Sequence, residues 1–185
     1  ALAKISGLKM CEYYNKQYGT DFRSLMPTNL YGQNDNFNLE NSHVLPALIR
    51  KFDDAKANRK KEVEVWGSGK PKREFLHVDD LATAILFLLE CDKKVLEQAL
   101  DEDIAHINVG TGKDIEISKL AKLVADIVGF NGDLKFNTNK PDGTMRKVLD
   151  VSKIHSLGWK HSIEIEEGIK DTYEWYKTSV VGLRL

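Results

Sequence analysis

The residues with the clearest potential for chemistry follow a short apolar run near the start of the chain. Phe22–Met26, closed by Pro27, has the composition of a buried strand, and Thr28 and Asn29 come directly after it. Ligands of open α/β sheets bind at the carboxyl ends of the strands. These polar groups therefore form a candidate binding edge. An ordinary turn into the Asn- and Gly-rich loop predicted over 28–42 explains the same residues about equally well.

A second group of reactive side chains follows a glycine-containing turn. Trp66-Gly67-Ser68-Gly69 precedes the strand-like run Arg73–Val78, which leads into Asp79 and Asp80. His77 and these two carboxylates have the composition of a metal site or an acid–base pair. A strand histidine followed by a helix cap explains them better, because carboxylates are favourable at a helix amino terminus. We predict no metal site here.

The elements that must position these residues alternate between strands and helices. Hydrophobic periodicity and chain breakers predict strands over 22–26, 63–66, 73–78, 106–109 and 134–136. The same signals predict helices over 1–18, 43–57, 79–89, 118–127, 152–157 and 165–178. Ser42 and Ser118 are the expected caps of two of these helices. This order is typical of an α/β architecture with parallel strands.

The composition excludes several classes of protein. The 185 residues are 42% hydrophobic and 30% charged, with a net charge of -1 and two isolated cysteines. Disordered chains, disulfide frameworks and zinc sites do not fit these values. Neither a membrane segment nor a broad surface for nucleic acid is expected. We therefore expect a reduced, cytoplasmic protein.

Two features suggest that the sequence is part of a longer protein. The chain opens on Ala1-Leu2-Ala3-Lys4, already helical in pattern and without a capping residue. It also contains no Gly-x-Gly-x-x-Gly loop, the usual cradle for a dinucleotide phosphate. We expect any such cradle to lie before Ala1.

In its motifs the chain resembles the extended short-chain dehydrogenase/reductase superfamily of nucleotide-sugar enzymes. That family has a Tyr-x-x-x-Lys pair opening a long helix, a Pro-Thr-Asn-like corner, and an Arg-Glu/Asp-Phe-x-His-Val-x-Asp run after a Gly-Ser-Gly turn. Lys4, Pro27-Thr28-Asn29 and Arg73–Asp80 stand at these places here. The resemblance implies that the catalytic tyrosine would come immediately before Ala1.

Further stretches narrow the resemblance within the superfamily. Ser24–Gly32, Asp35–Phe37, Asn41–Leu48 and Lys140–Thr144 are similar to members that use NADPH to epimerise GDP-4-keto-6-deoxy-D-mannose at C3 and C5 and reduce it at C4. The similarity runs from Ala1 to about Tyr176. It implies the carboxyl-terminal part of a Rossmann-type enzyme with a smaller mixed α/β substrate-binding domain. Without its missing half, the chain itself is expected to be inactive.

The resemblance also implies roles for individual residues. The catalytic residues would be Lys4, which lowers the pKa of the missing tyrosine, and His43, one of an acid–base pair whose partner cysteine lies upstream. Without this resemblance, a histidine at a helix start is more often a surface cap. Residues expected to bind NADP(H) are Lys4, Pro27, Thr28, Asn29, Leu30 and His43. Residues expected to bind the GDP-sugar substrate are Lys51, Trp66, Arg73, Asp142 and Lys147.

One departure from the family weakens the expected substrate binding. The family has a substrate-contacting arginine where this chain has Lys51, and lysine cannot make the same two-pronged phosphate contact. Arg50 beside it is a candidate substitute. Two alternatives stay open: an epimerase or dehydratase that retains NAD and acts on another sugar, and a non-catalytic module that binds sugar nucleotides.

The same resemblance divides the chain into parts. Residues 1–40 would close an NADP-binding Rossmann domain, and 41–176 would form mainly the substrate-binding domain. Segments 73–92 and 105–109 are candidates for a return to the Rossmann sheet, and 177–185 would be a tail. The first helix carries apolar residues on more than one face, which predicts a homodimer through that helix.

Overall fold

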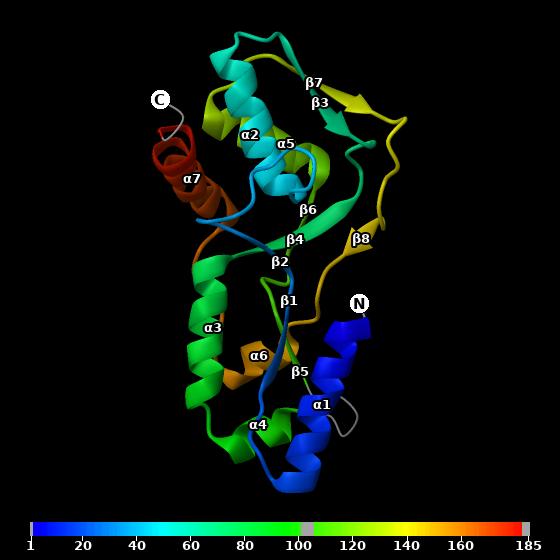
Figure 1. Cartoon of the computed structure of the whole chain (residues 1–185), viewed down its shortest axis with the longest axis vertical. Helices are drawn as coiled ribbons and strands as arrows, with labels where there is room; N and C mark the ends of the chain where they lie inside the picture. Colours follow the sequence, from blue (N-terminus) through cyan, green and yellow to red (C-terminus); the bar gives the residue numbers. More distant parts are fainter. Residues whose placement is uncertain (1, 101–105, 183–185) are drawn as a thin grey trace.

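The computed structural model describes residues 2–100 and 106–182, which form an elongated mixed α/β molecule (Figure 1). Ala1, residue 105 and residues 183–185 of the predictions above lie outside the described residues. The α-helices are α1 (Leu2–Tyr18), α2 (Val44–Ala57), α3 (Val78–Glu90), α4 (Lys93–Ala99), α5 (Ile117–Val128), α6 (Ser152–Leu157) and α7 (Ile165–Tyr176). Lys177–Val181 continues α7 as a single π-helical turn, η1, where we predicted a tail.

The strands form several small sheets. They are β1 (Ser24–Pro27), β2 (Asn29–Tyr31), β3 (Glu62–Trp66), β4 (Lys72–His77), β5 (His106–Val109), β6 (Asp114–Glu116), β7 (Asp133–Asn137) and β8 (Arg146–Lys147). The pairs β1–β5, β2–β4, β3–β7 and β4–β8 are parallel, whereas β4–β6 is antiparallel. The predicted α/β class with parallel strands is confirmed.

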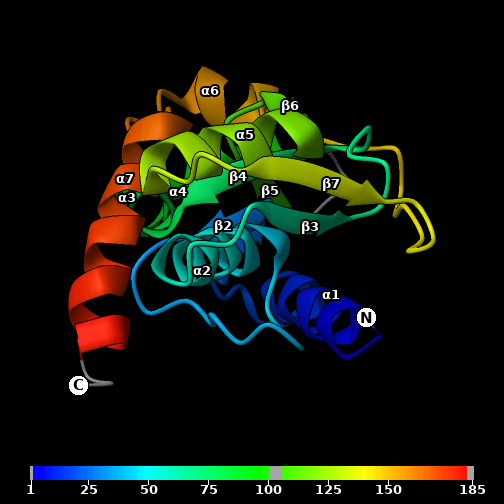
Figure 2. The same cartoon turned by 90° about the horizontal axis from the view of Figure 1, so that it is seen from above.

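Two hydrophobic cores divide the molecule into halves. In the upper half of Figure 1, α2 and α5 pack together beside β3 and β7, with α7 along their edge (Figure 2). In the lower half, α3, α4 and α6 enclose a smaller core against β5. The two halves meet along β2 and β4, because Phe75 of β4 belongs to the upper core and the next residue, Leu76, belongs to the lower one. Strand β4 therefore contributes to both cores and connects the two halves.

Several predicted elements differ from the structure. The loop predicted over 28–42 contains β2, which three residues form by pairing in parallel with β4. The strand predicted over 22–26 begins only at Ser24, and Met26 is exposed rather than buried. Its only partner among the described strands is β5, and Leu25 packs against the lower core.

The predicted helix caps are also displaced by one or two residues. His43 rather than Ser42 caps α2, and its side chain makes no capping hydrogen bond. Glu116 rather than Ser118 precedes α5, because Pro71 and Gly69 carbonyls accept from the first helical N–H groups. His77 caps α3, with its ring nitrogen accepting from Asp79 N–H. His77 thus lies on a strand, β4, as predicted, and it serves as the helix cap in place of Asp79.

Candidate functional site

Four of the residues predicted to act on the cofactor line one cavity. Thr28, Asn29, Leu30 and His43 surround a hollow of about 440 Å³ together with Asp35. It lies at the carboxyl end of β1 and along β2, where the sequence predicted a binding edge. The structure thus brings together residues from the 28–35 segment and the start of α2.

The side chains at this edge are fixed by strand β4. Thr28 is buried, and its hydroxyl donates to the Glu74 carbonyl over 3.3 Å. The Asn29 amide nitrogen donates to the same carbonyl over 2.7 Å. These bonds fix both side chains against β4, and the Asn29 amide keeps its side-chain oxygen and a second N–H for a ligand.

Glu74 itself joins the edge to two further segments. Its side chain is fully buried, and one carboxylate oxygen accepts from the backbone N–H groups of Thr111 and Gly112, each over 2.7 Å. The other oxygen accepts from Leu149 N–H over 2.8 Å. A Cβ at Gly110 would lie 2.2 Å from this carboxylate, so only glycine fits there. Glu74 therefore holds the β5 loop and the segment before α6 against β4.

His43 and Asp35 are the ionisable pair of the cavity. The His43 side chain is exposed. Asp35 is half-buried: one carboxylate oxygen accepts from Asn36 N–H over 2.7 Å, and the other is buried without a hydrogen-bond partner in the described chain. Burial raises the pKa of Asp35, and the charge of His43 opposes that rise.

A second cavity is lined by residues on either side of His43 in the sequence. It has a volume of about 250 Å³, and Lys51 and Trp66 line it together with Ser42 and Val44, the neighbours of His43. The Lys51 ammonium lies 4.9 Å from the centre of the Trp66 ring and donates to the Glu64 carbonyl over 3.1 Å. Burial lowers the pKa of Lys51, while the charge of Glu64 acts in the opposite direction.

Arg73 and Lys147 are neighbours across two strands. The register pairs Arg73 of β4 with Lys147 of β8, which places two cationic residues at one level of the sheet. The Arg73 guanidinium donates to the Lys72 carbonyl over 2.7 Å and to the Thr144 carbonyl over 2.5 Å. It thereby holds the 141–145 segment against β4.

Asp142 is fixed by the glycine turn after Trp66. Its carboxylate accepts from Ser68 N–H over 2.8 Å and from the Ser68 hydroxyl over 2.6 Å. These bonds hold the pKa of Asp142 below its usual range. Gly67 has a positive φ of 81°, and a Cβ there would lie 2.4 Å from the Asp142 carboxylate. The Gly-Ser-Gly turn thus positions the Asp142 loop beside Trp66.

Lys4 stands apart from these groups. It lies on the exposed surface of α1, and no hydrogen bond or ion pair within residues 2–100 and 106–182 connects it to the cavity residues. Its predicted role depends on a tyrosine before Ala1 and stays a prediction.

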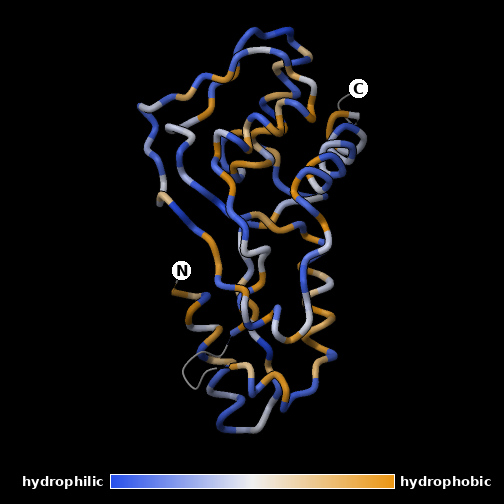
Figure 3. Tube along the Cα trace, turned by 180° about the vertical axis from the view of Figure 1, so that it is seen from behind, coloured by the Kyte–Doolittle hydropathy of each residue, from blue (hydrophilic) through white to orange (hydrophobic). Residues whose placement is uncertain are grey.

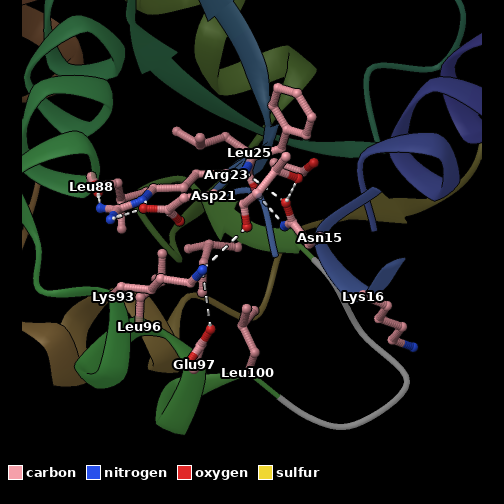
Figure 4. Close-up of a pocket in the computed structure, with 14 residues that line it drawn as sticks. Asn15, Lys16, Asp21, Arg23, Leu25, Leu88, Lys93, Leu96, Glu97 and Leu100 are labelled. Carbon is pink, nitrogen blue, oxygen red and sulfur yellow. Dashed lines mark hydrogen bonds and ion pairs between the residues drawn. The ribbon is translucent and has the colours of Figure 1, made fainter. Parts of the chain in front are cut away.

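A separate pocket lies at the other end of α1 and β1 (Figure 4). Here Arg23 donates to the carbonyls of Leu88 and Cys91 at the end of α3, and Lys93 donates to the Thr20 carbonyl just after α1. These cations compensate helix carboxyl termini, where carbonyls lack partners. We interpret this pocket as structural.

Two further properties concern the described chain as a whole. No three His, Cys, Asp or Glu side chains gather as a metal site within residues 2–100 and 106–182. None of the described helices combines the length and apolarity needed to cross a bilayer.

The topology and the polar groups at the carboxyl end of β1 define a class of protein: an α/β fold with a candidate binding edge at the ends of parallel strands. The sequence model of the NAD dependent epimerase/dehydratase family matches residues 1–110. The chain belongs to this family.

Several individual proteins are similar to almost the whole of this chain. GDP-L-fucose synthase of Escherichia coli strain K12 is 53% identical over 176 residues, covering 95% of this chain and 55% of the relative. GDP-L-fucose synthase 1 of Arabidopsis thaliana is 51% identical over 180 residues, covering 97% and 53%. The structure of MlghC, a GDP-mannoheptose C4 reductase from Campylobacter jejuni with NADP bound, is 46% identical with a TM-score of 0.79, covering 95% and 59%. The chain thus spans little more than half the length of these relatives.

Sequence reasoning missed three contributors to the site. Ser68 was noted only as a turn residue, Glu74 only as part of a motif, and Lys140 only as part of a similar stretch. Their contacts join segments far apart in the chain, and a single sequence carries no signal for such contacts.

Proposed function

We propose that this chain supplies the substrate-binding part and one cofactor edge of an enzyme that converts GDP-4-keto-6-deoxy-D-mannose to GDP-L-fucose with NADPH. The observation that carries the proposal is that consecutive residues at the start of α2 line two cavities. His43 lines the first cavity, and its neighbours Ser42 and Val44 line the second. One ligand spanning both would present its sugar to His43 and its nucleotide to Trp66.

The first cavity fits the nicotinamide end of the cofactor. Its volume of about 440 Å³ and the polar groups of the 28–30 segment suit a flat, polar ring. Gly32 and Val78 also line this cavity. A Cβ at Gly32 would lie 2.6 Å from a Val78 methyl group, so the absence of a side chain allows the backbone to approach α3 closely. When bound, NADPH supplies the hydride for reduction at C4. Pro27, Thr28, Asn29 and Leu30 would orient it, with Lys4 at its ribose.

His43 would move protons next to the ketone. Carbons C3 and C5 both flank the C4 carbonyl, so their protons are acidic, and inversion requires removal from one face and return to the other. His43 is exposed in the cavity and unused in capping, so its imidazole is available for one of these transfers. The opposite face needs a partner outside this chain.

The second cavity and the adjoining strands would bind the nucleotide. Arg73, Lys147 and Lys51 supply positive charge for the diphosphate. Trp66 offers an exposed ring to the base or sugar, and Asp142 can accept hydrogen bonds from guanine.

The test is turnover by the full-length protein. It should oxidise NADPH when given GDP-4-keto-6-deoxy-D-mannose and form GDP-L-fucose. His43→Gln should lower kcat by about 10²–10⁴-fold, the usual contribution of a general acid or base. His155→Gln on α6 is the matched control and should leave turnover unchanged. No turnover by folded full-length protein would overturn the proposal, as would tightly bound NAD without net NADPH oxidation.

A second candidate is the reduction of a GDP-linked keto-heptose. The Campylobacter jejuni relative carries the name of a GDP-mannoheptose C4 reductase and shares 46% of its residues with this chain. Both candidates require the GDP site, and they differ only in the sugar. A preference of at least about tenfold in kcat/KM for the keto-heptose would favour the second candidate.

We also propose that the protein forms a homodimer through α1. Helix α1 exposes Ile5, Met10, Tyr13 and Tyr14, and its only buried residue is Glu12, held by Lys9 and Lys16. A second copy would cover this apolar surface. The mass of the full-length protein in solution tests this directly.

A further inference from the structure

Two ammonium groups converge on the exposed ring of Trp66. The Lys51 ammonium, from α2, lies 4.9 Å from the ring centre, and the Lys140 ammonium, from the loop after β7, lies 5.1 Å from it. Trp66 closes β3 with 54% of its surface exposed, whereas the aromatic residues of the upper core are buried. The ring is thus open to a ligand while two cations lie against it.

These two charges have no carboxylate partner. Within residues 2–100 and 106–182, neither lysine forms an ion pair with Asp or Glu. Two acidic residues are nearby: Glu40 lines the same cavity as Lys51 and Trp66, and the Glu64 backbone carbonyl accepts from Lys51. The Glu64 carboxylate accepts from the Asn137 amide over 3.0 Å. A cation on an aromatic face gains only about 0.5–1 kcal/mol at an exposed site. Because neither ammonium is held in an ion pair, the two like charges at one ring favour an anion.

The loop that carries Lys140 is fixed in place. The Lys140 N–H donates to the Asn137 carbonyl over 3.1 Å, and Asp142, two residues on, is bound to Ser68 by two hydrogen bonds. Arg73 holds the Thr144 carbonyl beyond it. The ammonium of Lys140 is thus delivered to Trp66 by an anchored backbone, with only its own side chain free to reorient.

Two of the proposed diphosphate contacts, Arg73 and Lys51, offer fewer free hydrogen-bond donors than two unoccupied guanidinium groups would. Part of the Arg73 guanidinium is used by two carbonyls, so its full fork is not free for a diphosphate. Position 51 carries a single ammonium where a guanidinium would offer two parallel donors. The Lys140 ammonium, at the same ring as Lys51, would add hydrogen-bond donors for the diphosphate.

We propose that Lys140 is a further binding residue for the diphosphate. When the nucleotide binds, the ammonium groups of Lys140 and Lys51 leave the face of the Trp66 ring and contact the phosphates. The inference rests on the proposed function and extends it by one residue and one movement. A ring freed of its cations can stack with the base or sugar, so this movement couples diphosphate binding to stacking on Trp66.

Calorimetric titration with GDP, inorganic pyrophosphate and guanosine tests the proposal. Lys140→Met keeps the length and removes the charge, and Lys51→Met is its counterpart on α2. Each should weaken GDP and pyrophosphate binding by about tenfold and reduce its dependence on salt, while guanosine binding is unchanged. Lys135→Met is the matched control, because Lys135 lies on β7 and pairs with Glu62 over 2.5 Å.

The possible outcomes are distinguishable. Equal GDP affinity in the unmodified chain and in Lys140→Met, with Lys51→Met weakened, overturns this inference and leaves the proposed function standing. An unmodified folded chain that binds neither GDP nor pyrophosphate overturns both. A loss of guanosine affinity equal to that of pyrophosphate would assign Lys140 to the base and contradict its role at the diphosphate. Thermal unfolding of each variant verifies folding.

Discussion

The halves around α2 and around α1 differ in how completely they bury their apolar residues. Helix α5 buries six residues against α2 and α7, including Leu120, Val124 and Val128. Helix α1 buries one residue, which is charged, and α3 leaves Leu86 and Leu89 exposed. Figure 3 shows hydrophobic residues along α3 and at the start of α1. The upper half completes its own core, whereas the lower half presents surfaces suited to another protein segment.

This difference bears on function. The proposed nucleotide contacts, from Lys51 to Trp66 and from Arg73 to Lys147, all lie within or beside the completed half. The proposed cofactor contacts are Lys4, on the exposed surface of α1, and the 27–30 segment at the carboxyl end of β1. We therefore expect substrate binding to be a property of this chain and cofactor binding to need more than it.

The largest expected effect contrasts a core residue with a residue of α1. Phe52 is fully buried on α2 and packs on the ring of Phe130, so Phe52→Ala should lower the free energy of unfolding by about 3–5 kcal/mol. Ile5→Ala on α1 should change it by less than about 0.5 kcal/mol, because Ile5 is 58% exposed. Denaturant unfolding measures both. Equal losses would contradict the contrast between the halves.

A smaller effect is expected at the junction between the halves. Glu74→Gln keeps the shape of the side chain but turns an amide donor toward one of three backbone N–H groups. Leaving that buried donor unpaired should cost about 1–3 kcal/mol. Asp114→Asn is the control on β6, since Asp114 lies opposite Glu74 and forms an ion pair with the exposed side chain of Arg146. A Glu74→Gln variant as stable as this control would show that Glu74 does not join the segments as described.

The smallest effect is a dependence of stability on pH. The pKa of Asp35 is raised above its ordinary 3.8 by burial, so its ionised form destabilises the folded protein at neutral pH. Asp35→Asn should therefore raise Tm at pH 7, and the gain should fade as pH drops through the raised pKa toward 3.8. Asp54→Asn, which removes the partner of Arg50 on α2, should give no such gain. A gain that grows toward acid pH would contradict the assignment.

Sequence reasoning succeeded where a pattern is long or repeated. The apolar spacing in α2, α5 and α7 and the alternation in β3 indicated each element within a few residues. Strands of two or three residues, β2, β6 and β8, were missed because they form only by pairing with β4. Helix α4 was missed because seven residues carry too little periodicity.

The candidate site was only partly predictable for the same reason. Trp66, Arg73 and Asp142 stand in recognisable motifs, so their positions followed from a resemblance. The contact of Lys140 with Trp66 depends on β7 pairing in parallel with β3, which brings the loop after β7 beside the end of β3. The bonds of Glu74 likewise depend on three segments meeting. Neither follows from local spacing.

The most direct test of the account compares two titrations of the 185-residue chain itself. Calorimetry should detect binding of GDP in the micromolar range, about −8 kcal/mol, and Trp66→Ala should weaken it. NADPH should bind at least about a hundredfold more weakly, since the chain has no glycine-rich phosphate cradle. Tight binding of NADPH without binding of GDP would contradict the assignment of the completed half to the sugar nucleotide.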